Sequence, residues 1–544
     1  MSRHVLDASL AASRKLRGRG WVRICFPNGW NPNEIFDWYH QQDSTEIDTL
    51  QLYREYEEPF RHQFLIVTVR RSPWVYRFER RRTPTQGSPL DALTSGGTPA
   101  FDTVETFPSR SESPYNTPAE CLAELKFKRS VDLKFILAIC FGIQRDEGAQ
   151  NYTLQRFNCY FFAWSITACL ARYAESYETP SPDTLFRVLS LAEERHSACP
   201  PETIRWLRTE SPMLRGRIQA ALRRILWWDS LKDELQSTLQ EVAREHTLAK
   251  ARKDAKEAAA GAAWLSANAA SASALTHASR YAEAGPESSA HPLWVKAWLT
   301  AWPRSWNTAW DSACDSVQPT EWVTAFDSTW SKVWRHAKSV AWENSWEMAW
   351  EAMCGAPSSR SQRSHESDAR SAALAELENT ERHAARDKAR DVARKAITSA
   401  VADAISVSNV VAGPIAQATQ ECQSHHQSGC SITLIKERTG IFTKLKFSKS
   451  ESTQQVRLDI TNVQFQKFLT DLGKEHSARI ERLSLGTYES VLQDIREAMS
   501  RVWRVSLDAN EGETPPPREN WLVEAGHMIM GRTTNLNFRL NAYH

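Results

Sequence analysis

The sequence lacks a strong net charge. Its 67 lysines and arginines nearly balance 65 aspartates and glutamates, which leaves a formal net charge of +2 over 544 residues. A nearly neutral chain has no overall electrostatic attraction for nucleic acid or for an anionic membrane. We therefore expect no nucleic-acid partner.

Long apolar runs and closely paired cysteines are also missing. The longest apolar run, near residues 135–143, is far shorter than the roughly 20 residues of a membrane-spanning helix. The basic N-terminus has no apolar stretch behind it, so it does not resemble a secretory signal. The ten cysteines are scattered, as is typical of reduced thiols rather than of a disulfide framework. We expect a cytoplasmic or nuclear protein without a transmembrane segment.

The length of the chain exceeds what one hydrophobic core can organise, so several domains are expected. Composition changes along the chain and predicts an α+β N-terminal domain followed by a long, mainly α-helical region. The predicted divisions are an α+β domain over 1–195 with a flexible insertion near 83–119, long Ala-rich helices over 200–290, a Trp-rich helical block over 291–355, a second Ala-rich helix over 365–428, and an α+β or helical-hairpin segment with a flexible tail over 431–544.

Two short β-rich runs lie near the start of the first domain. Residues 62–69 and 74–79 flank a turn that contains Pro73, a pattern typical of a β-hairpin. After the Pro- and Ser-rich insertion, residues 118–143 are expected to form one or two helices.

Tryptophan is concentrated in the helical region. The aromatic residues of this block recur at four-residue intervals: Trp294, Trp298, Trp302, Trp306 and Trp310, then Trp322, Phe326, Trp330 and Trp334, then Trp342, Trp346 and Trp350. A four-residue spacing drifts around a straight helix. With Pro303 and Pro319 as interruptions, the spacing predicts a small bundle of short helices. An aromatic binding surface is the alternative, but a bundle core is favoured. The two flanking Ala-rich helices are expected to pack antiparallel.

The most specific chemical signal is the stretch over residues 151–164. A polar approach ends at Asn158-Cys159 and is followed by an apolar segment that predicts a buried helix. A thiol at a helix start meets the positive end of the helix dipole and unpaired backbone N–H groups, which favour the thiolate. Cys159 is therefore a candidate nucleophile.

A cysteine nucleophile needs a base, and the candidate is His62 at the head of the first predicted strand. A histidine on a strand, a second strand, and then Asn-Cys opening a buried helix resembles the lecithin:retinol acyltransferase-like proteins, a permuted branch of the NlpC/P60 papain-like superfamily. The resemblance covers about residues 50–180 and includes Tyr152, Asn158 and Phe162 around the cysteine.

The resemblance implies acyl transfer through a thioester, with Cys159 as nucleophile and His62 as base. It implies an amide or ester substrate of unknown identity and no cofactor. The family's third polar residue lies on the second strand, where Arg77 fits by position and Glu79 by chemistry, because an arginine cannot accept a hydrogen bond from the imidazole. The alternative is an inactive papain-like domain on a helical scaffold that binds a protein partner or self-associates.

Two further clusters have simpler explanations. Four potential zinc ligands, Cys422, His425, His426 and Cys430, lack the separated pairs of structural zinc sites, so a polar loop without metal is favoured. The arginines at 70, 71, 80, 81 and 82 could contact phosphate. Without a recognised nucleic-acid fold, a solvated loop is the favoured interpretation.

Overall fold

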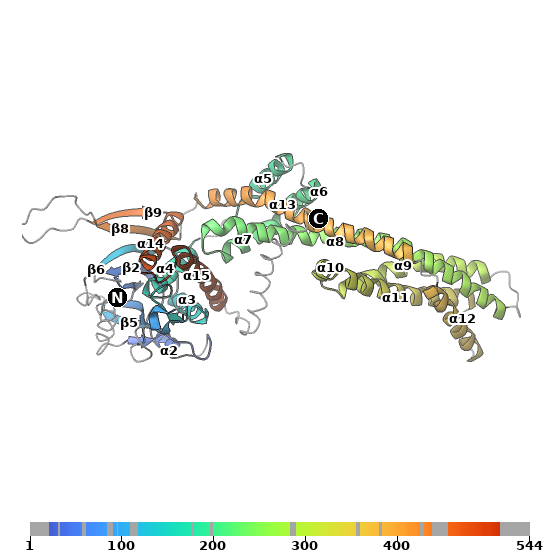
Figure 1. Cartoon of the computed structure of the whole chain (residues 1–544), viewed down its shortest axis with the longest axis horizontal. Coiled ribbons are helices and arrows are strands. Elements are labelled where there is room, and N and C mark those ends of the chain that lie inside the picture. Colours follow the sequence, from blue (N-terminus) through green and yellow to red (C-terminus); the bar gives the residue numbers. More distant parts are fainter. Residues whose placement is uncertain are drawn as a thin grey trace, which may run out of the picture. The chain divides into compact units, whose positions relative to one another are not determined.

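A computed structural model shows an antiparallel sheet built mainly by the N-terminal strands, and a long helical region after it (Figure 1). This arrangement confirms the mixed α and β class and the helical region. The structure describes residues 21–30, 33–56, 61–83, 91–94, 96–108, 118–175, 179–195, 200–282, 290–354, 360–379, 383–424, 429–437 and 455–511.

Within these residues, nine strands form the order β1-β5-β4-β3-β2-β6-β8-β9, with β7 paired to β5. Every pairing is antiparallel. The strands are β1 (Trp21–Arg23), β2 (Ile47–Glu55), β3 (Gln63–Val69), β4 (Trp74–Arg82), β5 (Thr98–Pro108), β6 (Ala119–Phe127), β7 (Asn151–Tyr152), β8 (Cys430–Glu437) and β9 (Gln455–Ile460). The predicted hairpin is confirmed, because β3 and β4 pair across the turn that contains Pro73.

Two predictions in this region are wrong. The flexible insertion expected over 83–119 contains β5, which pairs with the whole length of β4. Residues 84–90, 95 and 109–117 of this insertion lie outside the described residues. The segment expected to be helical from 118 begins as β6, and the helix α3 (Leu133–Arg145) starts only after it. Helix-forming Ala, Glu and Leu dominate β6, yet pairing with β2 outweighs this local preference.

Five helices share a hydrophobic core with the sheet: α2 (Glu34–His40), α3, α4 (Cys159–Tyr173), α14 (Asn462–Arg482) and α15 (Tyr488–Glu511). Leu65, Phe78 and Val104 face each other on neighbouring strands and are fully buried in this core. In Figure 1 the orange strands β8 and β9 and the red helices α14 and α15 lie beside the blue and cyan N-terminal elements. The helical hairpin predicted near the C-terminus is confirmed as α14 and α15, but it belongs to the N-terminal core rather than to a segment of its own.

The chain divides into two compact units. The first comprises 1–179, 219–231 and 419–544, and the second comprises 180–218 and 232–418. The sheet and its five helices belong to the first, which we call the sheet unit. The other is the helical unit. Its helices include α5 (Pro182–Arg195), α6 (Pro201–Thr209), most of α8 (Leu231–Ala282), α9 (Ala290–Asp315), α10 (Glu321–Thr324), α11 (Phe326–Cys354), α12 (Arg360–Asn379) and most of α13 (His383–Ser424), while α7 (Ser211–Arg224) continues from one unit into the other.

The two Ala-rich helices, α8 and α13, pack antiparallel as predicted. Gln236 Nε2 donates to Asn409 Oδ1 at 2.7 Å, and Thr247 Oγ1 donates to the carbonyl oxygen of Ala400 at 2.9 Å. Residue numbers rise along one helix as they fall along the other, which fixes the direction. By length and composition α13 is long and apolar enough to cross a membrane, although 39% of that stretch is buried inside the structure. Buried core helices can have the same composition.

The tryptophans of α9 and α11 form a continuous buried layer. Edge-to-face pairs between the two helices join Trp294 to Trp346, Trp298 to Trp342, Trp306 to Trp334 and Trp310 to Trp330, with ring centroids 5.1 to 5.8 Å apart. Such pairs contribute about 0.5–1.5 kcal/mol each beyond the burial of their surface. The bundle core is thus confirmed, whereas the short helices are not, because α9 continues through Pro303 over 26 residues and α11 spans 29.

Truncating one ring of this layer should destabilise the helical unit locally. Trp298 is 1% exposed and contacts rings on both helices, so Trp298→Ala should lower the free energy of opening of α9 and α11 by about 3–5 kcal/mol. Hydrogen-exchange mass spectrometry of α9 and α11 peptides measures this loss. The matched control is Leu299→Ala, since the neighbouring Leu299 is 51% exposed. Equal protection in the two variants would contradict a structural role for the layer.

Candidate functional site

Cys159 is the first residue of α4, as the sequence predicts. Asn158 caps this helix, because its side-chain oxygen accepts hydrogen bonds from the backbone N–H groups of Tyr160 and Phe161. Asparagine is among the residues best suited to this role. The helix is apolar and almost entirely buried, and Cys159 itself is only 4% exposed. The thiol is therefore held at a capped helix start inside the sheet unit.

A buried ion pair anchors the chain just before Cys159. Arg80 on β4 makes two hydrogen bonds to Asp102 on β5, at 2.7 and 2.9 Å. The same guanidinium donates to the carbonyl oxygens of Ala149 and Phe157, at 2.7 and 3.5 Å. Four acceptors around one fully buried arginine compensate for the loss of its hydration. The segment that ends at Cys159 is thus fixed to the strand that carries the other site residues.

His62, immediately before β3, is the charged partner of Cys159. Burial would lower the pKa of His62, but the charge of Cys159 and hydrogen bonds to Cys159 and Glu79 outweigh it and raise this pKa to about 9. Burial would likewise raise the pKa of Cys159, but the charge and hydrogen bond of His62 and the backbone N–H of Gln63 lower it. The two shifts have one cause, which is the mutual attraction of a thiolate and an imidazolium.

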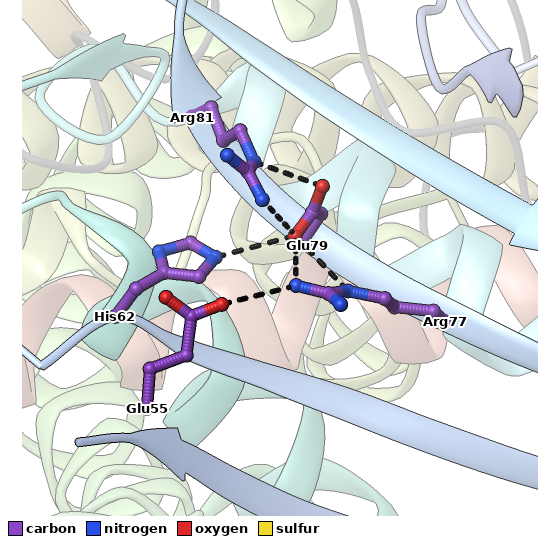
Figure 2. A network of polar contacts seen from close by, with 5 residues as sticks. All are labelled: Glu55, His62, Arg77, Glu79 and Arg81. Carbon is purple, nitrogen blue, oxygen red and sulfur yellow. Dashed lines mark hydrogen bonds and ion pairs between the residues drawn. The ribbon is translucent and has the colours of Figure 1, made fainter. Parts of the chain in front are cut away.

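Glu79 lies on the other side of the imidazole ring. Its Oε2 is 3.3 Å from His62 Nε2 and accepts hydrogen bonds from Arg77 and Arg81, each at 2.9 Å (Figure 2). Burial would raise the pKa of Glu79, but the charges of Arg81 and Arg77 and the hydrogen bond from His62 hold it well below its ordinary value. Since Nε2 faces Glu79, Nδ1 is the ring nitrogen left for the sulfur. Glu55 completes the network 3.4 Å from Arg77.

All five predicted site residues belong to this region of the sheet unit. Cys159 interacts with His62, His62 with Glu79, and Asn158 caps the helix of Cys159. Arg77 binds Glu79 and lies over the ring of Phe64, 3.9 Å from its centre. Of the two candidates for the third polar residue, Glu79 is the one hydrogen-bonded to the imidazole.

Sequence reasoning missed Glu55 and Arg81 as members of the network. Arg77, Glu79 and Arg81 are spaced by two along β4 and therefore share one face of the strand. That spacing was the available signal. The interpretation of Arg80, Arg81 and Arg82 as a solvated loop is wrong, because all three lie on β4 and are largely buried, with Arg80 and Arg81 in ion pairs.

Of the four potential zinc ligands, Cys422 and Cys430 belong to the described residues. His425 and His426 lie outside the described residues. Among the residues that the structure does describe, no group of three or more His, Cys, Asp or Glu side chains is arranged to hold a metal ion.

Comparisons with protein-family models, curated proteins and solved structures give no match to this chain. In space, the Cys159 thiol contacts the His62 imidazole, which in turn contacts the Glu79 carboxylate. A thiol, a group that can accept its proton and a carboxylate that orients this group are what thiol-based acyl transfer requires.

The lowered pKa of Cys159 predicts alkylation at unusually low pH. Iodoacetamide reacts with the thiolate, so the rate at Cys159 should rise with pH through an inflection below the value of about 8.5 that is ordinary for cysteine. In His62→Ala only the backbone N–H of Gln63 still opposes the burial of the sulfur, and burial is the larger effect, so the inflection should move above the ordinary value. The rate at pH 7 should then fall at least about tenfold.

Peptide mass spectrometry after timed labelling measures this rate for each cysteine separately. Cys422, which is half-buried and outside the network, is the internal reference. Identical pH profiles at Cys159 in the two proteins would show that no thiolate–imidazolium pair exists.

Proposed function

We propose that the protein is a cysteine-dependent hydrolase or acyltransferase that acts on an amide or ester. The single observation that carries the proposal is the placement of His62 between Cys159 and Glu79. The imidazole can take and return a proton at the sulfur side while Glu79 holds the ring and stabilises its positive charge.

In the proposed reaction, the thiolate of Cys159 attacks the carbonyl carbon of the substrate and forms a C–S bond. The C–N or C–O bond breaks as the imidazolium of His62 gives its proton to the leaving amine or alcohol. Water or an acceptor hydroxyl then loses its proton to the imidazole and attacks the thioester. The acid or the new ester leaves, and the sulfur departs as thiolate, which restores the ion pair.

We further propose that the sheet unit has the permuted papain-like fold of the lecithin:retinol acyltransferase-like proteins. Three features support this proposal. The histidine and the acidic residue come from adjacent antiparallel strands, β3 and β4. Those strands precede the helix that opens with Cys159. The helix contacts both strands, so the order of the chain and its packing agree with the resemblance in the sequence.

A second candidate function is that of an interaction protein with an inactive sheet unit. The burial of Cys159 favours it, because a sulfur that is 4% exposed meets a substrate only after a local movement. In this case the helical unit, with its long Ala- and Trp-rich helices, would bind a protein partner or a second copy of the chain.

An activated ester separates the two candidates. With p-nitrophenyl acetate, the wild-type protein should release p-nitrophenol and carry an acetyl group on Cys159, detected by peptide mass spectrometry. Cys159→Ala should do neither. Glu79→Gln should slow acylation by about 10²-fold or more, because an amide cannot stabilise the imidazolium as a carboxylate does.

The matched control is Cys169→Ala, which makes the same change to another buried cysteine of α4. Its thiol has a raised pKa because it is buried without a charged partner, so its loss should leave acylation unchanged. An unacylated Cys159 in a wild-type protein with native circular dichroism would exclude the enzymatic proposal and favour the interaction protein.

A further inference from the structure

A small hollow lined by arginines lies in the sheet unit. It has about 20 Å³ of open space, enough for one water or for one oxygen of a bound group. Arg54, Arg61 and Arg479 line it together with Gln63, Tyr160 and His476. We call this feature the arginine hollow.

The arginine hollow adjoins the candidate nucleophile. Two of its lining residues are neighbours of the reacting groups, since Tyr160 follows Cys159 in α4 and Gln63 follows His62. The backbone N–H of Gln63 is a hydrogen-bond donor to Cys159. The charge of Cys159 also contributes to the raised pKa of Tyr160, after burial, while Arg479 and Arg54 act in the opposite direction. Cys159 and His62 are not among the lining residues of the hollow, but the contacts of Gln63 and Tyr160 with Cys159 place the hollow close to the sulfur.

The charge of the arginine hollow favours an anion, because three arginines line it against one acidic residue, Glu475. Arg54 is already paired with Glu120 at 2.6 Å. Arg479 is held more loosely, by Glu475 at 3.4 Å and by the hydroxyl of Tyr160 at 3.5 Å. Both distances lie beyond the optimum for charge-assisted hydrogen bonds. The guanidinium of Arg479 can therefore exchange these weak contacts for a hydrogen bond to a bound anion with little loss of free energy.

His476 also lines the arginine hollow, and one of its ring nitrogens, Nδ1, has no hydrogen-bond partner among the described residues. It is 4% exposed, and burial lowers its pKa to about 4, so the ring is neutral at pH 7. Its Nε2 lies 2.9 Å from the carbonyl oxygen of Gln155, which can only accept, so Nε2 carries the proton. Nδ1 is buried and has no hydrogen-bond partner among the described residues. A buried acceptor without a partner is costly, and a bound N–H or O–H group would satisfy it.

We propose that the arginine hollow binds an anionic group of the substrate, a carboxylate or a phosphate, beside the carbonyl that Cys159 attacks. This inference rests on the proposed function. Arg479 supplies the main charge-assisted hydrogen bond to the anion. The Nδ1 of His476 accepts a hydrogen bond from an N–H or O–H group next to it. The substrate class is therefore an amide or ester that carries a negative charge near the scissile bond.

A matched pair of alkylating reagents tests the proposal. Iodoacetate and iodoacetamide deliver nearly the same group to a thiolate but differ by one negative charge. The measured quantity is the alkylation rate of Cys159 with iodoacetate divided by its rate with iodoacetamide. A change in the thiolate fraction or in the opening of the site affects both rates equally and cancels in this ratio. Arg479→Gln should lower this ratio about tenfold, the effect of losing one charge-assisted hydrogen bond.

The control is Arg482→Gln, which removes the same charge from an exposed position on the same helix. It should leave the ratio within a factor of two in 0.15 M salt, where more distant charges are screened over about 8 Å. Added acetate and added inorganic phosphate, compared at equal ionic strength, distinguish the two anions. The one that slows iodoacetate more is the better mimic of the group.

Equal ratios in the wild-type protein and in Arg479→Gln would overturn the anion site. That result would leave the proposed function intact if Cys159 is still acetylated by p-nitrophenyl acetate. Conversely, a tenfold change in the ratio without any acetylation would support anion binding beside a thiol that does not turn over. The two failures are therefore distinguishable.

Discussion

The buried carboxylate of Glu79 is the constraint on which the site depends. It accepts hydrogen bonds from Arg77 and Arg81 and faces His62, so three cationic groups converge on one anion inside the sheet unit. Without it the positive charges buried there would outnumber the negative ones, and an uncompensated charge in a protein interior is strongly destabilising. The thiolate of Cys159 then balances the charge of His62. The geometry of the candidate site and the stability of the sheet unit thus depend on the same ion pairs.

The local part of the site could be predicted from the sequence, whereas its surroundings could not. A cysteine after an asparagine cap, and a histidine at the head of a β-rich run, are short-range patterns, and both elements formed as expected. Arg81 and Glu55 were missed because their role depends on strand register, which brings β2 and β4 to either side of β3. His476 comes from a helix more than three hundred positions along the chain. No local pattern marks such a contact.

In the helical unit, too, the sequence pattern predicts one feature correctly and another wrongly. The four-residue spacing of tryptophan correctly predicts a buried layer. It also predicts short helices, because such a stripe drifts around a straight helix, and this second prediction is wrong for α9 and α11. Both α9 and α11 carry the same spacing, and their rings stay paired along both helices. A drift common to two partners does not separate them. The continuous pairing of the rings depends on both helices, so it could not be predicted from the spacing in either helix alone.

The construction of the sheet unit has a consequence for its synthesis. Phe465 and Trp503 are completely buried in the same core as Leu65 and Phe78, and β8 pairs with β6. A nascent chain that has just emerged beyond Cys159 therefore lacks the residues that close this core. The helices of the helical unit are translated before β8, β9, α14 and α15, so the core around the thiol site is completed only after residue 511 has been made. Premature termination after α13 would leave the nucleophile in an unfinished domain, with the edge of β6 unpaired.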